Sequence, residues 1–190
     1  MQKECLDGDR LFVIHGFYTS EECVRAIGRS EASGFDDATI NTVRGVVLNK
    51  TIRDNARLIV DDIDLAASLW DRLRPFVPAV LAPWHVVGLN ERFRFYRYDE
   101  GQRFAPHFDG FFQRDNGERS QLTCLVYLND DFTGGETKFY DEEKALRATI
   151  RPERGTALLF AHLQLHEGAP VTSGRKYVLR TDVMYERRPA

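Results

Sequence analysis

The chain has 190 residues, a formal net charge of -3 and 29% charged residues. This length fits one domain with a hydrophobic core, and the charge balance gives no sign of a nucleic-acid partner. The three cysteines, Cys5, Cys23 and Cys124, lack the paired spacing of a zinc site or a disulfide framework. No apolar run approaches the roughly 18 residues that span a bilayer, and the N-terminus has no signal-peptide core. We therefore expect a cytoplasmic protein without a membrane partner.

The first regular elements are expected close to the N-terminus. Arg10 to Ile14 is a short apolar segment. Thr19 to Glu22 has the spacing of a capping box, in which a hydroxyl and a carboxylate satisfy two backbone N–H groups at a helix start. The spacing predicts a helix from about Ser20 to Ala32, ended by Gly34.

A second helix is expected after an acidic start. Asp61, Asp62 and Asp64 favour a helix N-terminus, and apolar residues then recur at helical spacing until Pro75. These are Leu65, Leu69, Trp70 and Leu73. Residues 41–55, between the two helices, show no clear period and are interpreted as a loop or irregular hairpin, followed by an extended segment at about Arg57 to Val60.

From Val86 onward the apolar period changes to two, which predicts strands joined by glycine-rich turns. The expected strands are Val86 to Tyr98, Ser120 to Leu128, Glu136 to Tyr140, Ala157 to Phe160 and Lys176 to Tyr185. Helices followed by antiparallel strands indicate a mainly β, α+β protein, with the helices on the outer face of a sandwich or jelly roll. We expect a single domain over 1–190, with a support region at 1–85 and a catalytic β core at 86–190.

A candidate metal site lies in the strand region. His107 and Asp109 flank Phe108, and alternate residues of a strand project to the same side. A distant histidine would complete the two-histidine, one-carboxylate face typical of non-haem iron oxygenases. His162 and His166 both suit that third place by spacing. Lys176, ten residues after His166 at the start of an apolar strand, favours His166, because a long cation there is unexpected unless it meets an anion.

Three ordered segments resemble the prolyl 4-hydroxylase group of 2-oxoglutarate-dependent oxygenases. The first runs from Arg97 to Asp109 and resembles the iron-binding segment. The second, Leu122 to Asn129 with 134–137, resembles the next strand and turn. The third joins His166 to Val171 with Lys176 and Tyr177, and resembles the distal histidine and the cosubstrate cation. The likeness covers about 93–185, and three motifs in order are more specific than any one of them.

The resemblance implies a cupin-like double-stranded β-helix in which His107, Asp109 and His166 bind Fe(II). It further implies that Lys176 pairs with the distal carboxylate of 2-oxoglutarate and that the hydroxyls of Tyr98 and Tyr127 contact the same cosubstrate. The expected reaction uses O2 to hydroxylate a peptidyl proline, with succinate and CO2 as coproducts and ascorbate as the reductant. An intact carboxylate ligand argues against halogenation.

Strand parity agrees with this arrangement. On the strand from 120 to 128, Leu122, Cys124, Val126 and Leu128 form an apolar face, which leaves the face of Gln121, Thr123, Leu125 and Tyr127 for the barrel interior. On the strand before it, Phe93 and Phe95 should pack outward. Arg94, Tyr96 and Tyr98 should then line the pocket, with a solvated position at a sheet edge as the alternative for Arg94.

Several points stay open at the level of sequence. Arg175 could replace or assist Lys176, residues 41–55 could be a mobile flap or an ordinary loop, and Arg180 and Asp182 could touch substrate or merely pair with each other. The oligomeric state is not predicted.

Three other functions compete with the peptide hydroxylase. One is the same chemistry on a free amino acid or metabolite, favoured by the positive charge of Arg92, Arg94, Arg97 and Arg103. Another is a β-helix domain that binds metal and peptide without turnover. A zinc hydrolase is weakened because no general base at zincin-type spacing appears.

Overall fold

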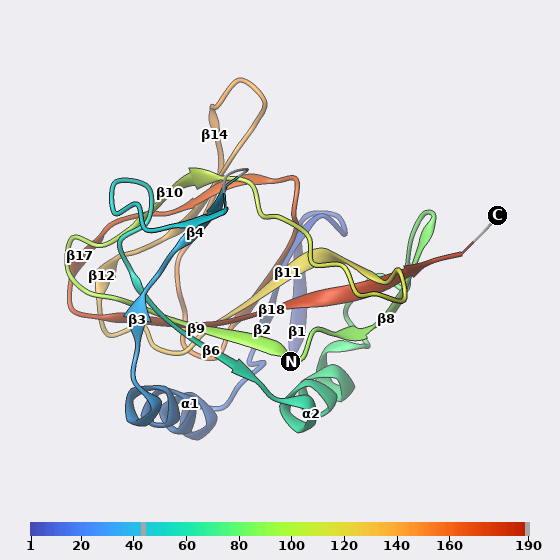
Figure 1. Ribbon diagram of the computed structural model, residues 1–190, viewed down its shortest axis with the longest axis horizontal. Helices are drawn as coiled ribbons and strands as arrows, with labels where there is room; N and C mark the ends of the chain where they lie inside the picture. The colour runs from blue at the N-terminus through green and yellow to red at the C-terminus, as the bar shows by residue number, and fades with distance from the viewer. Residues whose placement is uncertain (43–44, 189–190) are drawn as a thin grey trace.

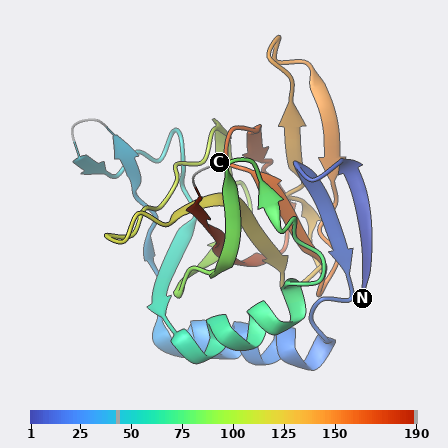
Figure 2. The same ribbon diagram turned by 90° about the vertical axis from the view of Figure 1, so that its right-hand side faces the viewer.

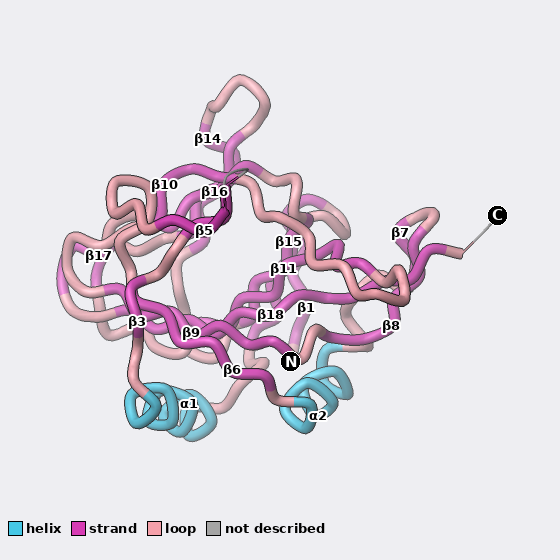
Figure 3. The backbone as a smooth tube through the Cα atoms, in the orientation of Figure 1, coloured by secondary structure: helices cyan, strands magenta, loops and turns pink. Residues whose placement is uncertain are grey.

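Strands dominate the computed structural model, which describes residues 1–42 and 45–188 (Figure 3). The large sheet contains β1 (Gln2–Asp7), β2 (Leu11–His15), β3 (Asp36–Asp37), β6 (Ala56–Asp61), β7 (Val80–Leu81), β8 (Trp84–Leu89), β9 (Arg92–Tyr98), β11 (Arg119–Tyr127), β15 (Ala157–Ala161) and β18 (Lys176–Arg187). Its main order is β1-β2-β15-β11-β18-β9-β6-β3, with β8 beside β18 and β7 beside β8.

A smaller sheet faces the large one across the barrel (Figure 1). Its strands, in the order β10-β16-β13-β14, are β10 (Phe104–His107), β16 (Leu165–Gly168), β13 (Thr137–Tyr140) and β14 (Leu146–Ile150). Two short pairs complete the described strands: β12 (Thr133–Gly134) with β17 (Val171–Ser173), and β4 (Ile40–Thr42) with β5 (Gly45–Val47). The arrangement is the expected double-stranded β-helix.

Both helices cover the outer face of the large sheet, as predicted (Figure 2). The first, α1 (Ser20–Ser33), begins with the capping box: the Thr19 hydroxyl accepts a hydrogen bond from the Glu22 amide, and the Glu22 carboxylate accepts one from the Thr19 amide. The second, α2 (Ile63–Leu73), is capped by Asp62, whose carboxylate accepts from the Leu65 amide. Neither helix is long and apolar enough to cross a membrane, and the described residues contain no other candidate span.

The two faces of the large sheet bury different side chains, and the predicted parity is confirmed. Leu122, Cys124 and Val126 pack with Phe93 and Phe95 on the side of the helices. The interior cluster takes the alternate residues, among them Tyr96, Tyr98, Leu125 and Tyr127. Polar and aromatic groups are thereby directed into the barrel, where the site lies.

The long strand expected from Val86 to Tyr98 is wrong in one respect, because it is two strands. Asn90 and Glu91 separate β8 from β9, and the Asn90 side-chain oxygen accepts a hydrogen bond from the Arg92 amide. The two strands then pair with different parts of β18. A polar side chain that bonds its own backbone two residues on is a turn signal.

The segment 41–55 contains part of the β4–β5 hairpin, in keeping with an irregular hairpin, although residues 43–44 lie outside the described chain. Its end is attached to β10, the strand that ends at His107: the Ala105 amide donates to the Ile52 carbonyl across 2.8 Å, and Arg53 forms a β-bridge with Phe104. The mobile-flap hypothesis stays a prediction.

Candidate active site

His107, Asp109 and His166 come together inside the barrel. His107 ends β10 and lies opposite His166 of the neighbouring β16. His107 Nε2 is 3.7 Å from Asp109 Oδ1, and His166 Nε2 is 3.7 Å from Asp109 Oδ2. All three ligand atoms lie within 4.8 Å of one another. Side-chain adjustments of about an ångström would bring them to metal-bonding distance, near 2.1 Å.

Asp109 does not share a strand with His107, contrary to the expectation from alternation. β10 ends at His107, and Asp109 lies on the loop that follows. The backbone amide of Asp109 donates to the His162 carbonyl across 3.1 Å. The intervening Phe108 is 59% exposed, so the chain still turns the histidine and the carboxylate inward together.

Both histidines are prepared to offer Nε2 to a metal. His107 Nδ1 is 2.8 Å from the Ala105 carbonyl, and His166 Nδ1 is 2.9 Å from the Gln164 carbonyl. A carbonyl can only accept, so each Nδ1 carries the proton and each Nε2 keeps a lone pair. Burial lowers the pKa of His166 to about 4, which keeps its ring neutral at pH 7.

Asp109 is ionised and held from two sides. Arg180 Nη1 donates to its Oδ1 across 2.8 Å, and the Thr123 hydroxyl donates to its Oδ2 across 2.6 Å. Burial alone would raise the pKa of Asp109, but the Arg180 guanidinium outweighs it and holds this pKa well below its usual range. Sequence reasoning placed Arg180 and Thr123 on the interior face but did not connect them to Asp109.

His162, the competing third ligand, lies outside this group. Its two ring nitrogens contact the hydroxyls of Ser120, at 2.8 Å, and Thr123, at 3.0 Å. Thr123 in turn donates to Asp109, so His162 supports the carboxylate from one residue away. The geometry favours His166 as the metal ligand.

Lys176 is a buried side chain that lines the same recess as His107, Asp109 and His166. The residue is 3% exposed, and its Nζ donates to the Gly135 carbonyl across 2.6 Å. The rings of Tyr98 and Tyr127 lie 5.2 and 5.6 Å from Nζ. Within residues 1–42 and 45–188, no carboxylate lies at ion-pair distance from it. Burial lowers the pKa of Lys176 to about 7.

The neighbouring Arg175 faces the surface instead. Its Nε lies 2.5 Å from Asp99 Oδ1, and 49% of its side chain is exposed. The geometry therefore supports Lys176 over Arg175 as the cation within the recess.

The two predicted tyrosines stand in different positions. Tyr98 lines the recess between the histidines and Lys176. Tyr127 is fully buried, and its hydroxyl is paired with that of Thr137 at 2.7 Å. Contact of both hydroxyls with a cosubstrate stays a prediction, and Thr137, which lines the recess, is a position that sequence reasoning missed.

These residues fit the groups that the resemblance implies. Two neutral imidazoles and one carboxylate form a donor set suited to Fe(II). A buried ammonium without a carboxylate partner suits the distal carboxylate of 2-oxoglutarate, since an unpaired buried charge is otherwise strongly disfavoured.

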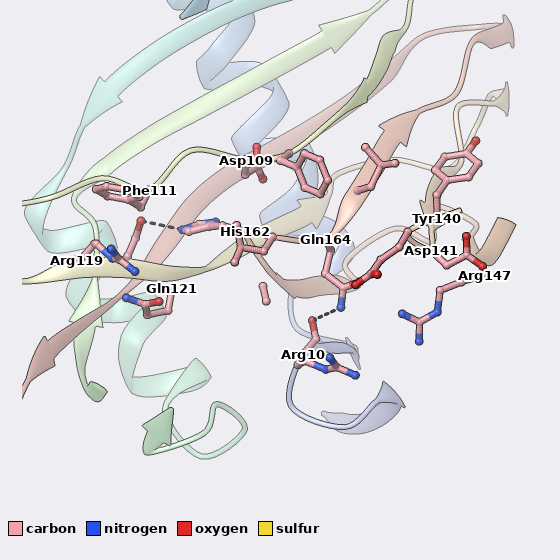
Figure 4. A pocket seen from close by; sticks show the side chains of 16 residues that line it. Arg10, Asp109, Phe111, Arg119, Gln121, Tyr140, Asp141, Arg147, His162 and Gln164 are labelled. Carbon is pink, nitrogen blue, oxygen red and sulfur yellow. Dashed lines mark hydrogen bonds between the residues drawn. The ribbon is translucent and has the colours of Figure 1, made fainter. Parts of the chain in front are cut away.

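Asp109 also lines a second, wider cleft of about 690 Å3 (Figure 4). Three of its lining side chains are large, apolar and exposed: Phe108, Phe111 and Leu163. Arg119 lies over the Phe111 ring, 4.4 Å from its centroid. The cleft is wide enough for a ligand much larger than the cosubstrate.

Comparison with known proteins gives one consistent result. Residues 93–181 match the profile of the 2OG-Fe(II) oxygenase superfamily. The chain is 30% identical to probable prolyl 4-hydroxylase 3 of Arabidopsis thaliana, over 88% of this chain and 67% of that protein. It spans about two thirds of the length of the curated relatives it matches.

Two solved structures share the fold. One is a viral collagen prolyl hydroxylase from Paramecium Bursaria Chlorella virus-1 in its 2OG complex, at a TM-score of 0.65 and 22% identity, covering 95% of this chain and 99% of that one. The other is a Trichoplax adhaerens prolyl hydroxylase in complex with a hypoxia inducible factor peptide fragment. Its TM-score is 0.73 at 21% identity, and the match covers 94% of this chain and 84% of that one. At these identities the likeness establishes the fold alone.

Proposed function

Since the chain belongs to the 2OG-Fe(II) oxygenase superfamily, we propose that it hydroxylates a peptidyl proline and converts 2-oxoglutarate to succinate and CO2. One observation carries this proposal. A two-histidine, one-carboxylate group and a buried lysine that has no carboxylate partner among the described residues line the same recess. A domain that only bound metal would have no use for the lysine.

His107, Asp109 and His166 would hold Fe(II), and Lys176 would hold 2-oxoglutarate. When bound, the iron and the cosubstrate supply the oxidising power that transfers oxygen from O2 to a C–H bond. The surrounding residues orient and shield this site. Arg180 and Thr123 fix the carboxylate, and the Phe104 ring stacks on His107 with centroids 3.5 Å apart, which limits the approach of water.

The choice of a peptidyl proline is supported by the relatives and by the cleft. Both solved structures described above are prolyl hydroxylases, and one holds a peptide fragment. The cleft beside Asp109 is open and edged by exposed apolar side chains, as a groove for an extended peptide would be. A free amino acid or small metabolite is the alternative substrate class.

The test is coupled turnover. Purified protein is incubated with Fe(II), 2-oxoglutarate, O2 and a panel of short proline peptides, and succinate and peptide mass are measured together. The proposal expects succinate release that depends on one peptide class, with a gain of one oxygen atom on proline. Stimulation by metabolites alone would favour the small-substrate alternative. The same assay with and without ascorbate tests our proposal that ascorbate is the reductant, and cell fractionation tests the proposed cytoplasmic location.

A further inference from the structure

Four arginines gather on the inner face of the large sheet beside the metal ligands. The strands β6, β9 and β18 lie side by side in the large sheet (Figure 1). Arg94 lies directly opposite Arg180 in the β9–β18 pairing, and Arg57 lies opposite Tyr96 in the β6–β9 pairing. Directly opposed residues project to the same face of a sheet. Arg53, from the loop before β6, places its guanidinium carbon 4.5 Å from the centroids of both Tyr96 and Phe104. We call Arg53, Arg57, Arg94 and Arg180 the arginine cluster.

The cluster adjoins the reaction centre. Arg180 contacts Asp109. The Phe104 ring lies against the Arg53 guanidinium and also stacks on the His107 ring. Tyr96 and Arg180 also line the recess that leads to Lys176. A group bound by the cluster would therefore lie next to the iron.

The cluster has more positive charge than its carboxylates balance. Arg94 pairs with Asp182 at 3.2 Å, and Arg180 pairs with both Asp182 and Asp109. The remaining two have neutral partners: Arg53 donates to the Asn55 amide oxygen at 2.7 Å, and Arg57 donates to the Thr39 hydroxyl at 2.9 Å. Within the described chain, no carboxylate lies at ion-pair distance from Arg53 or Arg57.

Two donor atoms of the cluster also lack a hydrogen-bond partner among the described residues. Arg53 Nη2 and Arg180 Nε are buried and make no hydrogen bond to any described residue. Arg53 is only 5% exposed. Buried donors are disfavoured unless they meet an acceptor, and the carboxylate of a ligand bound beside the cluster would supply one.

The local field agrees with this count. Burial raises the pKa of the Tyr96 hydroxyl, yet the charges of Arg180, Arg53 and Arg94 pull this pKa below its usual value. Burial, with Arg53 and Arg94 nearby, lowers the pKa of Arg57. The surroundings of Tyr96 therefore favour an anion.

We propose that the arginine cluster binds a carboxylate of the substrate, adjacent to the carbon that is hydroxylated. This inference rests on the proposed function and names the substrate class more closely. The carboxylate could come from an acidic residue next to the target proline in a peptide, or from the α-carboxylate of a free amino acid. Both supply the same two acceptor oxygens, which match the fork of an arginine.

The cosubstrate does not account for the excess charge. The two charges of Fe(II) cancel those of 2-oxoglutarate, and Lys176 cancels Asp109. Among the carboxylates that form ion pairs with the cluster in the described part of the chain, Asp182 alone then remains to balance the four arginines. Arg94 is the outermost member among those in ion pairs, with 20% of its side chain exposed against 12% for Arg180, so a substrate would meet the cluster there.

Of the four arginines that the sequence placed near the site, only Arg94 belongs to this cluster. Arg92 pairs with Asp61 and Arg97 with Glu31, both partly exposed. Arg92 is on the same strand as Arg94 and is therefore a matched control.

The test measures binding to the 190-residue protein loaded with Mn(II) and 2-oxoglutarate, by isothermal titration calorimetry at constant ionic strength. Two probe pairs differ only in a carboxylate: acetyl-Glu-Pro-amide against acetyl-Gln-Pro-amide, and N-acetylproline against N-acetylprolinamide. The acidic member of at least one pair should bind about tenfold tighter or more, the size expected for one charge-assisted contact. The pair that shows the preference identifies the source of the carboxylate.

Variants then locate the site. Arg94→Gln and, as a second variant, Arg57→Gln should each reduce the preference to below about threefold, whereas Arg92→Gln should retain it. Equal binding of acidic and neutral probes by wild-type protein would overturn the inference. So would a preference that survives both Arg94→Gln and Arg57→Gln in folded protein.

Turnover separates this inference from the proposed function. Hydroxylation of neutral and acidic proline peptides with equal kcat/KM would reject the carboxylate site and leave the proline hydroxylase standing. If acidic probes bind through the cluster but no proline compound gains oxygen, the carboxylate site would stand and the proline hydroxylase would be rejected.

Discussion

Arg180 donates a hydrogen bond to Asp109 across 2.8 Å, so the carboxylate ligand is held in a buried ion pair before any metal binds. The side chain of Asp109 is 4% exposed and that of Arg180 12%. Such a pair orients the ligand, but it also ties the stability of the metal-free protein to the arginine.

Replacing this arginine should make stability depend on the metal. Arg180→Met leaves Asp109 and Asp182 without their shared cation, and the free energy of unfolding of the metal-free protein should fall by about 3–5 kcal/mol. Saturating Mn(II) should restore part of this loss because it neutralises Asp109. Urea unfolding with and without Mn(II) measures both effects, and Arg180→Lys is the control that keeps the charge. Equal stabilisation of wild type and Arg180→Met by Mn(II) would contradict the role assigned to the pair.

The two buried histidines should respond differently to removal. His166→Ala deletes a ligand and should abolish measurable Mn(II) binding. His162→Ala removes a group that contacts Ser120 and Thr123, so it should weaken binding by no more than about 10- to 100-fold. Calorimetric titration of the metal-free proteins gives both affinities. The assignment of the third ligand is wrong if His162→Ala has the larger effect.

Cosubstrate binding should weaken as the pH rises above about 7. The pKa of Lys176 is lowered to about 7 by burial, and only its protonated form pairs with a carboxylate. The dissociation constant of 2-oxoglutarate should stay constant below this pKa and rise towards tenfold per pH unit above it. Titrations of Mn(II)-loaded protein from about pH 6 to 8.5 measure this, and Lys176→Arg should flatten the profile because guanidinium does not titrate there. A wild-type affinity that is level across the range would refute the assignment.

A glycine turn should control the position of Lys176. Gly134 has a φ of 73°, and a Cβ there would lie 2.4 Å from the Pro170 carbonyl oxygen. The next residue, Gly135, provides the carbonyl that accepts from Lys176. Gly134→Ala should lower the free energy of unfolding by about 2–4 kcal/mol and weaken 2-oxoglutarate binding.

The control for this change is Gly28→Ala, within α1. No atom outside the neighbouring helix backbone lies within 4 Å of a Cβ built there, and the substitution should stabilise the protein by up to about 1 kcal/mol through helix propensity. Thermal unfolding and 2-oxoglutarate titration of both variants give the comparison. Unchanged stability in Gly134→Ala would show that the turn tolerates a side chain.

Local chemistry was enough to predict much of the fold. The capping box at Thr19 and Glu22 fixed the start of α1, and the period of two on β9 and β11 correctly assigned Phe93 and Tyr96 to opposite faces. By contrast, β1 was not predicted because its sequence is largely polar. It is an edge strand whose pairing with β2 is a tertiary event.

The metal-ligand set was proposed from a motif, whereas its supports arise from chain segments that meet only in the folded protein. Alternation placed Asp109 on a strand, yet it lies beyond the end of β10 on a loop held by His162. Arg53 was not predicted as a site residue, because its segment shows no periodicity. Its stacking on Phe104 depends on the β-bridge between these two residues, which are distant in sequence. Sequence separation conceals such pairings, because no local pattern encodes them.

The most direct test of the central claim is anaerobic reconstitution with Fe(II) and 2-oxoglutarate, followed by visible absorption spectroscopy of wild type, His166→Ala and Lys176→Ala. The account predicts a weak charge-transfer band in wild type that is lost in His166→Ala and that requires much higher 2-oxoglutarate concentrations in Lys176→Ala. A wild-type protein that binds Fe(II) but shows no band at saturating 2-oxoglutarate would contradict it.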